Sequence, residues 1–192
     1  MKEKQTWSLS EHNTLYGVNF NKGLAKWLLQ NLKFDSLLEF GCGPGYYCKF
    51  WNDNGVETVH GIEPELMDKN NFMNEGCEQF CYDITNQDEP DGILPHYDVI
   101  TTIEVLEHID QKFHDIIFDY FVSKNPKAII FSAARPGQAG HGHIACRTKE
   151  DWASELIKRG YELNQIQTDD ICESSDKKNV NHRRNLQIFY KK

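Results

Sequence analysis

An acidic residue followed by a glycine turn is the part of this sequence best suited to binding a ligand. Glu39 precedes Gly41, Gly43 and Gly45, and a run of apolar residues comes just before. Glycines at this spacing allow a sharp turn and let a ligand approach bare backbone. A carboxylate directly before the turn repels a pyrophosphate and suits a cationic ligand. Position 46 is a tyrosine, so the third glycine of a dinucleotide fingerprint is missing.

Two histidines on a glycine-rich stretch are candidates for proton transfer. His141 and His143 end the segment 135–143, which also contains three glycines and a proline. Imidazole is the side chain that most often removes a proton from a reacting hydroxyl. We take His143 as the first candidate for such a base and His141 as the second. Two surface histidines on a loop would give the same pattern, so the sequence leaves both interpretations open.

Further candidate residues follow the other expected strands. Glu63 comes 22 positions after Gly41, the spacing of an acid that accepts hydrogen bonds from ribose hydroxyls. Asp83 with Ile84 ends a later strand, and 103–104 ends another. Ligands of open α/β sheets bind beyond the carboxyl ends of the strands. The sequence therefore predicts that these residues meet the glycine turn at one edge of a sheet.

The elements that must position these residues alternate between strands and helices. This alternation predicts an α/β fold, a doubly wound, seven-stranded, mostly parallel sheet. Two strands in succession near the end of the chain predict an antiparallel last strand, with a polar, mobile loop at 169–183 between them. The expected strands are 36–40, 56–62, 77–81, 97–102, 128–132, 161–167 and 186–190. The expected helices are 8–32, 46–54, 65–74, 111–123 and 148–159.

Composition narrows the class of protein. The 192 residues are 39% hydrophobic and 26% charged, which predicts one globular domain over 1–192, with 1–33 as an N-terminal helical cap or lid. The first residues lack the apolar core of a signal peptide, and we expect a cytoplasmic protein with no membrane partner. The formal net charge of −8 argues against a nucleic-acid partner. A homodimer is consistent with this composition.

The glycine turn, the residues at the strand ends and the final pair of strands resemble the class I S-adenosylmethionine-dependent methyltransferases over almost the whole chain. The resemblance implies a Rossmann-like methyltransferase fold and S-adenosylmethionine as cofactor. It implies that Glu63 binds the ribose, Asp83 the adenine amino group and Ile84 the adenine ring, with 103–104 at the methyl end. The complete set of cofactor residues implied is Glu39, Gly41, Gly43, Gly45, Glu63, Asp83, Ile84, Ile103 and Glu104.

The implied reaction is methyl transfer to an oxygen, rather than a nitrogen, of a small-molecule or sugar acceptor, without a metal ion. A first alternative comes from Glu104, Glu107, His108 and His143. These residues resemble the ligand set of metal-dependent RNA 3′-terminal 2′-O-methyltransferases, in which a divalent ion grips the terminal ribose hydroxyls. Mixed carboxylate and imidazole ligands suit Mg²⁺ or Mn²⁺ poorly to moderately. A second alternative is a non-catalytic cofactor-binding partner subunit, which would have no need of the histidines in 135–143.

Overall fold

The computed structural model describes residues 19–64 and 77–192. Most of the expected N-terminal cap and the helix expected at 65–74 lie outside these residues. The strands are β1 (Ser36–Phe40), β2 (Thr58–Glu63), β3 (Glu78–Cys81), β4 (Val99–Ile103), β5 (Ala128–Ser132), β6 (Tyr161–Leu163) and β7 (Gln187–Lys191). The α-helices are α2 (Lys22–Asn31), α3 (Tyr46–Asp53), α4 (His114–Ser123), α5 (Lys149–Ile157), α6 (Gln165–Ser174) and α7 (Val180–Asn185). Two short 3₁₀ helices are η2 (Leu106–His108) and η3 (Gln111–Phe113).

All seven strands form one sheet in the order β3-β2-β1-β4-β5-β7-β6. The pairs from β3 to β5 are parallel, and β7 runs antiparallel to both β5 and β6. The expected doubly wound sheet with an antiparallel last strand is confirmed. The chain moves outward in both directions from the neighbours β1 and β4, so the carboxyl ends of these two strands form the topological switch point, where ligands bind.

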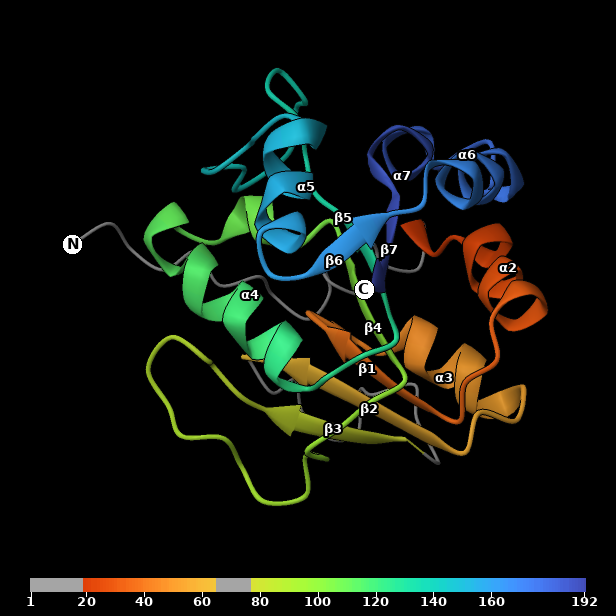
Figure 1. Cartoon of the computed structure of the whole chain (residues 1–192), viewed down its shortest axis with the longest axis vertical. Helices are drawn as coiled ribbons and strands as arrows, with labels where there is room; N and C mark the ends of the chain where they lie inside the picture. Colours follow the sequence, from red (N-terminus) through yellow and green to blue (C-terminus); the bar gives the residue numbers. More distant parts are fainter. Residues whose placement is uncertain (1–18, 65–76) are drawn as a thin grey trace.

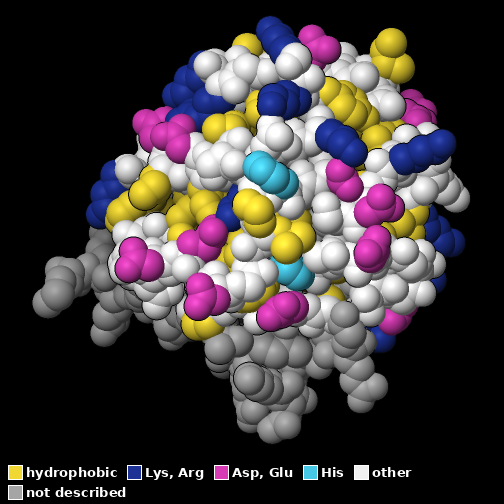
Figure 2. All heavy atoms as spheres, turned by 60° about the horizontal axis from the view of Figure 1, so that its bottom comes forward, with side chains coloured by type: hydrophobic (Ala, Val, Ile, Leu, Met, Phe, Trp, Pro, Cys, Tyr) yellow, Lys and Arg dark blue, Asp and Glu magenta, His cyan; other side chains and the backbone are white. Residues whose placement is uncertain are grey.

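Helices cover both faces of the sheet (Figure 1). Along β1 the side chains alternate between faces: Leu37 packs with α2, α3 and α6 on one face, and Leu38 packs with α4 and α5 on the other. Both leucines are fully buried. On the face shown in Figure 2, Lys and Arg side chains are interspersed with Asp and Glu rather than gathered in a stripe. None of the helices described is long and apolar enough to cross a membrane.

The segment between the last two strands corrects the sequence prediction. A strand was expected over 161–167 and a mobile loop over 169–183, but β6 ends at Leu163 and two helices follow. Asn164 starts α6 because its side chain accepts a hydrogen bond from the backbone amide of Gln167 (3.0 Å). Trp27 of α2 donates its indole N–H to Asp170 of α6 (2.7 Å). The segment is therefore helical and is anchored to α2.

Candidate active site

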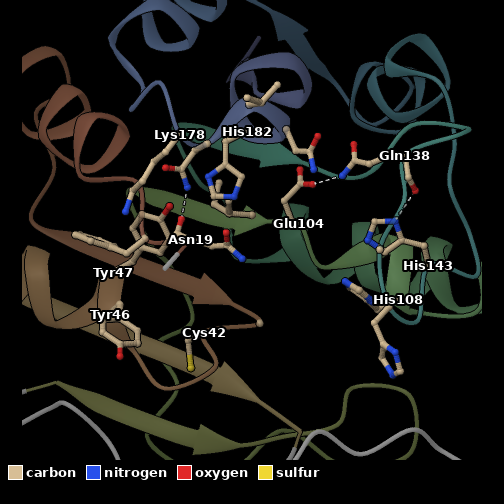
Figure 3. Close-up of a pocket in the computed structure, with 18 of the residues that line it drawn as sticks. Asn19, Cys42, Tyr46, Tyr47, Glu104, His108, Gln138, His143, Lys178 and His182 are labelled. Carbon is tan, nitrogen blue, oxygen red and sulfur yellow. Dashed lines mark hydrogen bonds between the residues drawn. The ribbon is translucent and has the colours of Figure 1, made fainter. Parts of the chain in front are cut away.

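A cavity of about 490 Å³ opens at the carboxyl ends of β1 and β4. Its described walls come from the glycine turn, the start of α3, the segment 138–143 and the residues 178–182 at the start of α7. Figure 3 shows His108 and His143 at one end and Lys178 and Tyr47 at the other. Glu104 lies between these two ends, at the point where β4 gives way to a loop. The cavity is large enough for a ligand of cofactor size.

The cavity brings together part of the residue set predicted from sequence. Six predicted residues line it: Glu39, Gly41, Ile103, Glu104, His141 and His143. Five others are not among the described residues that line it: Gly43, Gly45, Glu63, Asp83 and Ile84. The cofactor contacts proposed for these five residues stay predictions.

The carboxylates of Glu63 and Asp83 have structural partners of their own. Glu63 accepts a hydrogen bond from the backbone amide of Gly43 (2.9 Å) and so fixes the glycine turn from the neighbouring strand. Asp83 accepts hydrogen bonds from the backbone amide and hydroxyl of Thr85 (3.0 and 2.6 Å) and from the side-chain amide of Asn86 (2.9 Å). These contacts hold both carboxylates in place at their strand ends.

Glycine is required at the first position of the turn. Gly41 has a φ of +76°, and a Cβ at this position would lie 2.5 Å from a methyl carbon of Val105. Gly45 also has a positive φ, of +82°, and forms the N-cap of α3. Side chains at these positions would strain the backbone, and at Gly41 they would also collide with Val105. At Gly41 the turn therefore presents bare backbone to the cavity.

Glu39 is an unusual carboxyl group because it lines the cavity and yet is only 3% exposed. Burial raises its pKa to about 8, the hydrogen bonds from Cys48 oppose the shift, and the charge of Glu63 adds to it. The thiol of Cys48 donates to its Oε2 (2.9 Å). Near neutral pH the empty site therefore holds a mostly protonated Glu39. A bound cation would favour its ionised form.

His143 has a fixed tautomer. Its Nδ1 lies 3.1 Å from the carbonyl oxygen of Gln138, and a carbonyl can only accept, so Nδ1 carries the proton and donates it. Nε2 then keeps its lone pair and lies 3.9 Å from Oε1 of Glu107. The ring also packs edge-on against His108, with centroids 4.9 Å apart. This arrangement, with the distal nitrogen anchored to a carbonyl, is the usual one for a histidine that binds a metal ion.

Glu107 is fully buried, and neither carboxylate oxygen accepts a hydrogen bond from the residues described. Burial raises its pKa to about 9, and the negative charge of Glu104 adds to the shift. The backbone amides of Glu107 and Ala134 lower this pKa in part, although neither amide meets the criteria for a hydrogen bond to the carboxylate. Burial and the neighbouring His143 lower the pKa of His108 to about 4. Ligand atoms of Glu107, His108 and His143 all lie within 4.8 Å of one another, so these residues, which we call the Glu107 cluster, could hold a metal ion.

Glu104 is held by two amides that the sequence analysis did not single out. Its carboxylate accepts hydrogen bonds from the side chains of Gln138 (2.8 Å) and Asn185 (3.0 Å). Its backbone has a φ of +56° and its amide donates to the carbonyl of Ser132 (2.9 Å). Asn185 and the cavity residue His182 both come from α7, and His182 falls in the stretch 169–183 that was expected to be a loop. Their polar sequence gave no signal that could have placed them at the site.

Comparison with known proteins identifies the family. A sequence model described as a methyltransferase domain matches residues 17–131, more than half of the chain. The chain belongs to this family. The matched region contains the glycine turn, Glu39, Glu104 and the 3₁₀ helix that carries Glu107 and His108. The expectation of a methyltransferase is confirmed. Solved structures of similar fold contain bound S-adenosylmethionine or S-adenosylhomocysteine.

Solved structures confirm the methyltransferase fold at low sequence identity. Magnesium protoporphyrin IX methyltransferase from Synechocystis PCC 6803, solved with bound S-adenosylhomocysteine, is 12% identical with a TM-score of 0.62, over 96% of this chain and 87% of its own. The methyltransferase domain of bacterial CtHen1-C is 20% identical with a TM-score of 0.58, over 95% and 98%. An S-adenosylmethionine-dependent methyltransferase from Mesorhizobium loti is 15% identical with a TM-score of 0.53, over 86% and 96%. No curated protein matches the chain in sequence.

Proposed function

We propose that this methyltransferase methylates a hydroxyl oxygen of a sugar with two adjacent hydroxyls, and that a divalent metal ion bound by the Glu107 cluster assists the reaction. The observation that supports this proposal is the buried carboxylate of Glu107, which faces two imidazoles and has no hydrogen-bond partner among the residues described. Sequence reasoning preferred a metal-free site with His143 as the base. It considered a metal ion only for the alternative with an RNA 3′ terminus, whereas the geometry of Glu107, His108 and His143 favours a metal ion for the sugar acceptor as well.

A metal ion accounts for the chemistry of this cluster better than a free base does. A buried carboxyl group without hydrogen bonds is costly, and a cation in contact with Glu107 removes that cost. The Nε2 lone pair of His143 faces Glu107, as a ligand to a shared ion would. Two imidazoles with one carboxylate suit Mn²⁺, Co²⁺ or Zn²⁺ better than Mg²⁺. Glu104 lies near enough to act on Glu107 electrostatically and provides a further carboxylate at the same edge.

An oxygen acceptor follows from this cluster. A bound divalent ion would polarise an alcohol oxygen and make its proton easier to remove. The protein's own contribution is to place that oxygen in line with the methyl group, since alignment supplies much of the rate in such a transfer. Two adjacent hydroxyls on one sugar ring can reach a single ion together. The cavity lining contributes polar side chains, including Glu104, Gln138 and Asn181.

A small sugar fits the charge of the cavity better than a long nucleic acid does. Among the described residues that line it, Lys178 is the one lysine or arginine, while phosphate backbones are bound by several such cations. The net charge of −8 points the same way. The 3′-terminal ribose of RNA is the second candidate, because Glu107, His108 and His143 lie close together, Glu104 acts on Glu107 electrostatically, and this ribose carries the same pair of hydroxyls.

The test is methyl transfer from radiolabelled S-adenosylmethionine with Mn²⁺ or with EDTA. The acceptors are methyl β-ribofuranoside, a set of methyl hexopyranosides, and a short RNA with a free 3′ end. Each acceptor has a periodate-treated control, in which the adjacent hydroxyls are destroyed. We expect transfer that requires Mn²⁺, is abolished by periodate treatment and is lost in Glu107→Gln but kept in Glu150→Gln, which alters an exposed carboxylate on α5. Transfer at the full rate in EDTA would contradict the metal-dependent proposal.

A further inference from the structure

Helix α7 places a buried histidine in the cavity wall. His182 lines the cavity and is only 8% exposed. Its Nδ1 is buried and has no hydrogen-bond partner among the described residues. Figure 3 shows the ring pointing from α7 into the cavity, on the same side as Glu104 and apart from His108 and His143. His182 is not part of the Glu107 cluster. Its buried, unpaired nitrogen needs a ligand to complete its hydrogen bonding.

The surroundings of His182 suit a group that gains a proton briefly. Burial lowers the pKa of its imidazole, and the negative charge of Glu104 acts in the opposite direction. The ring is therefore mostly neutral near pH 7, and a carboxylate is in place to stabilise the cation when it forms. Glu104 is fixed for this role by hydrogen bonds from Gln138 and Asn185. The other titratable side chains in the described cavity walls are Glu39, Cys42, Tyr46, Tyr47, His108, His141, His143 and Lys178.

We propose that His182 is the general base of the methyl transfer, an inference that rests on the oxygen acceptor proposed above. Its imidazole removes the proton of the acceptor hydroxyl as the oxygen forms its bond to the methyl carbon. The carbon–sulfur bond of S-adenosylmethionine breaks in the same step, and its electron pair stays on sulfur. The products are the methyl ether, S-adenosylhomocysteine and the imidazolium form of His182. This imidazolium then releases its proton to water.

The other histidines of the cavity are less suited to this role. His143 already donates its Nδ1 proton to Gln138 and directs Nε2 toward Glu107. His108 belongs to the same cluster. His141 is exposed, whereas His182 is buried in the cavity wall. The Nδ1 of His182 has no hydrogen-bond partner among the described residues, and the ring is near enough to Glu104 to be affected by that charge.

Imidazole NMR on protein with ¹⁵N-labelled histidine tests the placement of His182 without any acceptor. The resonance of His182 is assigned with His182→Gln, and its titration is compared between complexes with S-adenosylhomocysteine and with sinefungin, an analogue whose amine stands where the transferable methyl would be. A base at the reacting centre lies close to that cation, so we expect a lower pKa for His182 in the sinefungin complex. His96, exposed and outside this cavity, is the control. Equal titration of His182 in the two complexes would overturn the proposal.

Kinetics separate a base from a structural role. Once an acceptor is found, His182→Gln should lower kcat by about 100-fold or more, the usual contribution of a general base. Its KM and its affinities for S-adenosylhomocysteine and Mn²⁺ should stay unchanged, as in His96→Gln. An unchanged kcat, or a loss of cofactor affinity, would remove His182 from the chemistry. If the wild-type protein methylates no hydroxyl, the proposed function fails by itself, and the NMR comparison still decides whether His182 faces the methyl position.

Discussion

The imidazole of His143 occupies the space that a side chain at Gly140 would need. A Cβ on Gly140 would lie 2.1 Å from Nε2 of His143, the nitrogen that faces Glu107. The absence of a side chain at position 140 is therefore what lets His143 reach the Glu107 cluster. Within the glycine-rich segment 135–143, position 140 must therefore be a glycine if His143 is to keep this place.

Replacing this glycine should disable the metal site. In Gly140→Ala the new Cβ displaces the His143 ring, and we expect Mn²⁺ affinity to fall by at least about tenfold, as when a metal ligand is poorly oriented. Isothermal titration with Mn²⁺ measures this change. Gly137→Ala is the control, because it strains a backbone with φ of +83° but its Cβ would meet nothing within 4 Å. If both variants bind Mn²⁺ like the wild type, His143 is not a ligand.

The pH dependence of metal binding should report on Glu107. Its pKa of about 9 means that the carboxyl group holds a proton that the metal ion must displace. Mn²⁺ affinity should therefore rise by up to about tenfold per pH unit between about pH 6.5 and 8.5. His108, with a pKa of about 4, is neutral throughout this range and adds nothing to the slope. Glu107→Gln should remove the slope together with most of the affinity, whereas a slope retained in this variant would assign the proton to another group.

The same carboxyl group should make the metal-free protein less stable at higher pH. Below the unperturbed pKa of 4.5, Glu107 is protonated in both the folded and the unfolded chain and has no effect. Above it the unfolded chain loses the proton while the folded chain keeps it up to about pH 9. The free energy of unfolding should therefore fall by up to about 1.4 kcal/mol per pH unit from this group.

Glu107→Gln removes the titrating group and keeps the shape of the side chain. In urea titrations without metal, the variant should be more stable than the wild type by about 2 to 3 kcal/mol near pH 7. Saturating Mn²⁺ should reverse the order, because it stabilises only the protein that binds it. If the free energy of unfolding changes with pH in the same way in both proteins, Glu107 ionises normally. That result would contradict a buried Glu107 carboxyl group without hydrogen-bond partners. A gain in stability at the expense of binding is common for residues of functional sites.

Sequence reasoning succeeded for the short apolar runs that form central strands. The bounds of β1 and β5 agree with their expected ranges, and Glu39 and Glu104 lie at the cavity because they end the two central strands. It failed for α6 and α7, where most residues are polar; in α6 the buried side chains are those of Thr168 and Ile171. A local pattern carries no information on such tertiary anchoring.

Part of the site was unpredictable for a related reason. Asn185 contacts Glu104 across 81 positions of sequence, and His182 precedes it by one helical turn on α7. These contacts exist because β7 pairs with β5 in antiparallel fashion, which brings the end of α7 beside the carboxyl end of β4. The order of strands in a sheet, rather than any motif, creates this part of the cavity.

Cofactor affinity should depend on the ionisation of Glu39. If this carboxylate faces the ammonium group of the cofactor, binding requires its ionised form, which its pKa of about 8 makes scarce at lower pH. Affinity for S-adenosylhomocysteine should then rise by up to about tenfold per unit between about pH 6 and 8. Binding near pH 7 should release most of one proton, which is measured by calorimetry in buffers of different ionisation enthalpy. Glu39→Gln should bind more weakly at pH 8 and lose this proton release, whereas Glu150→Gln should keep both. Proton release that persists in Glu39→Gln would show that the ammonium lies elsewhere in the cavity.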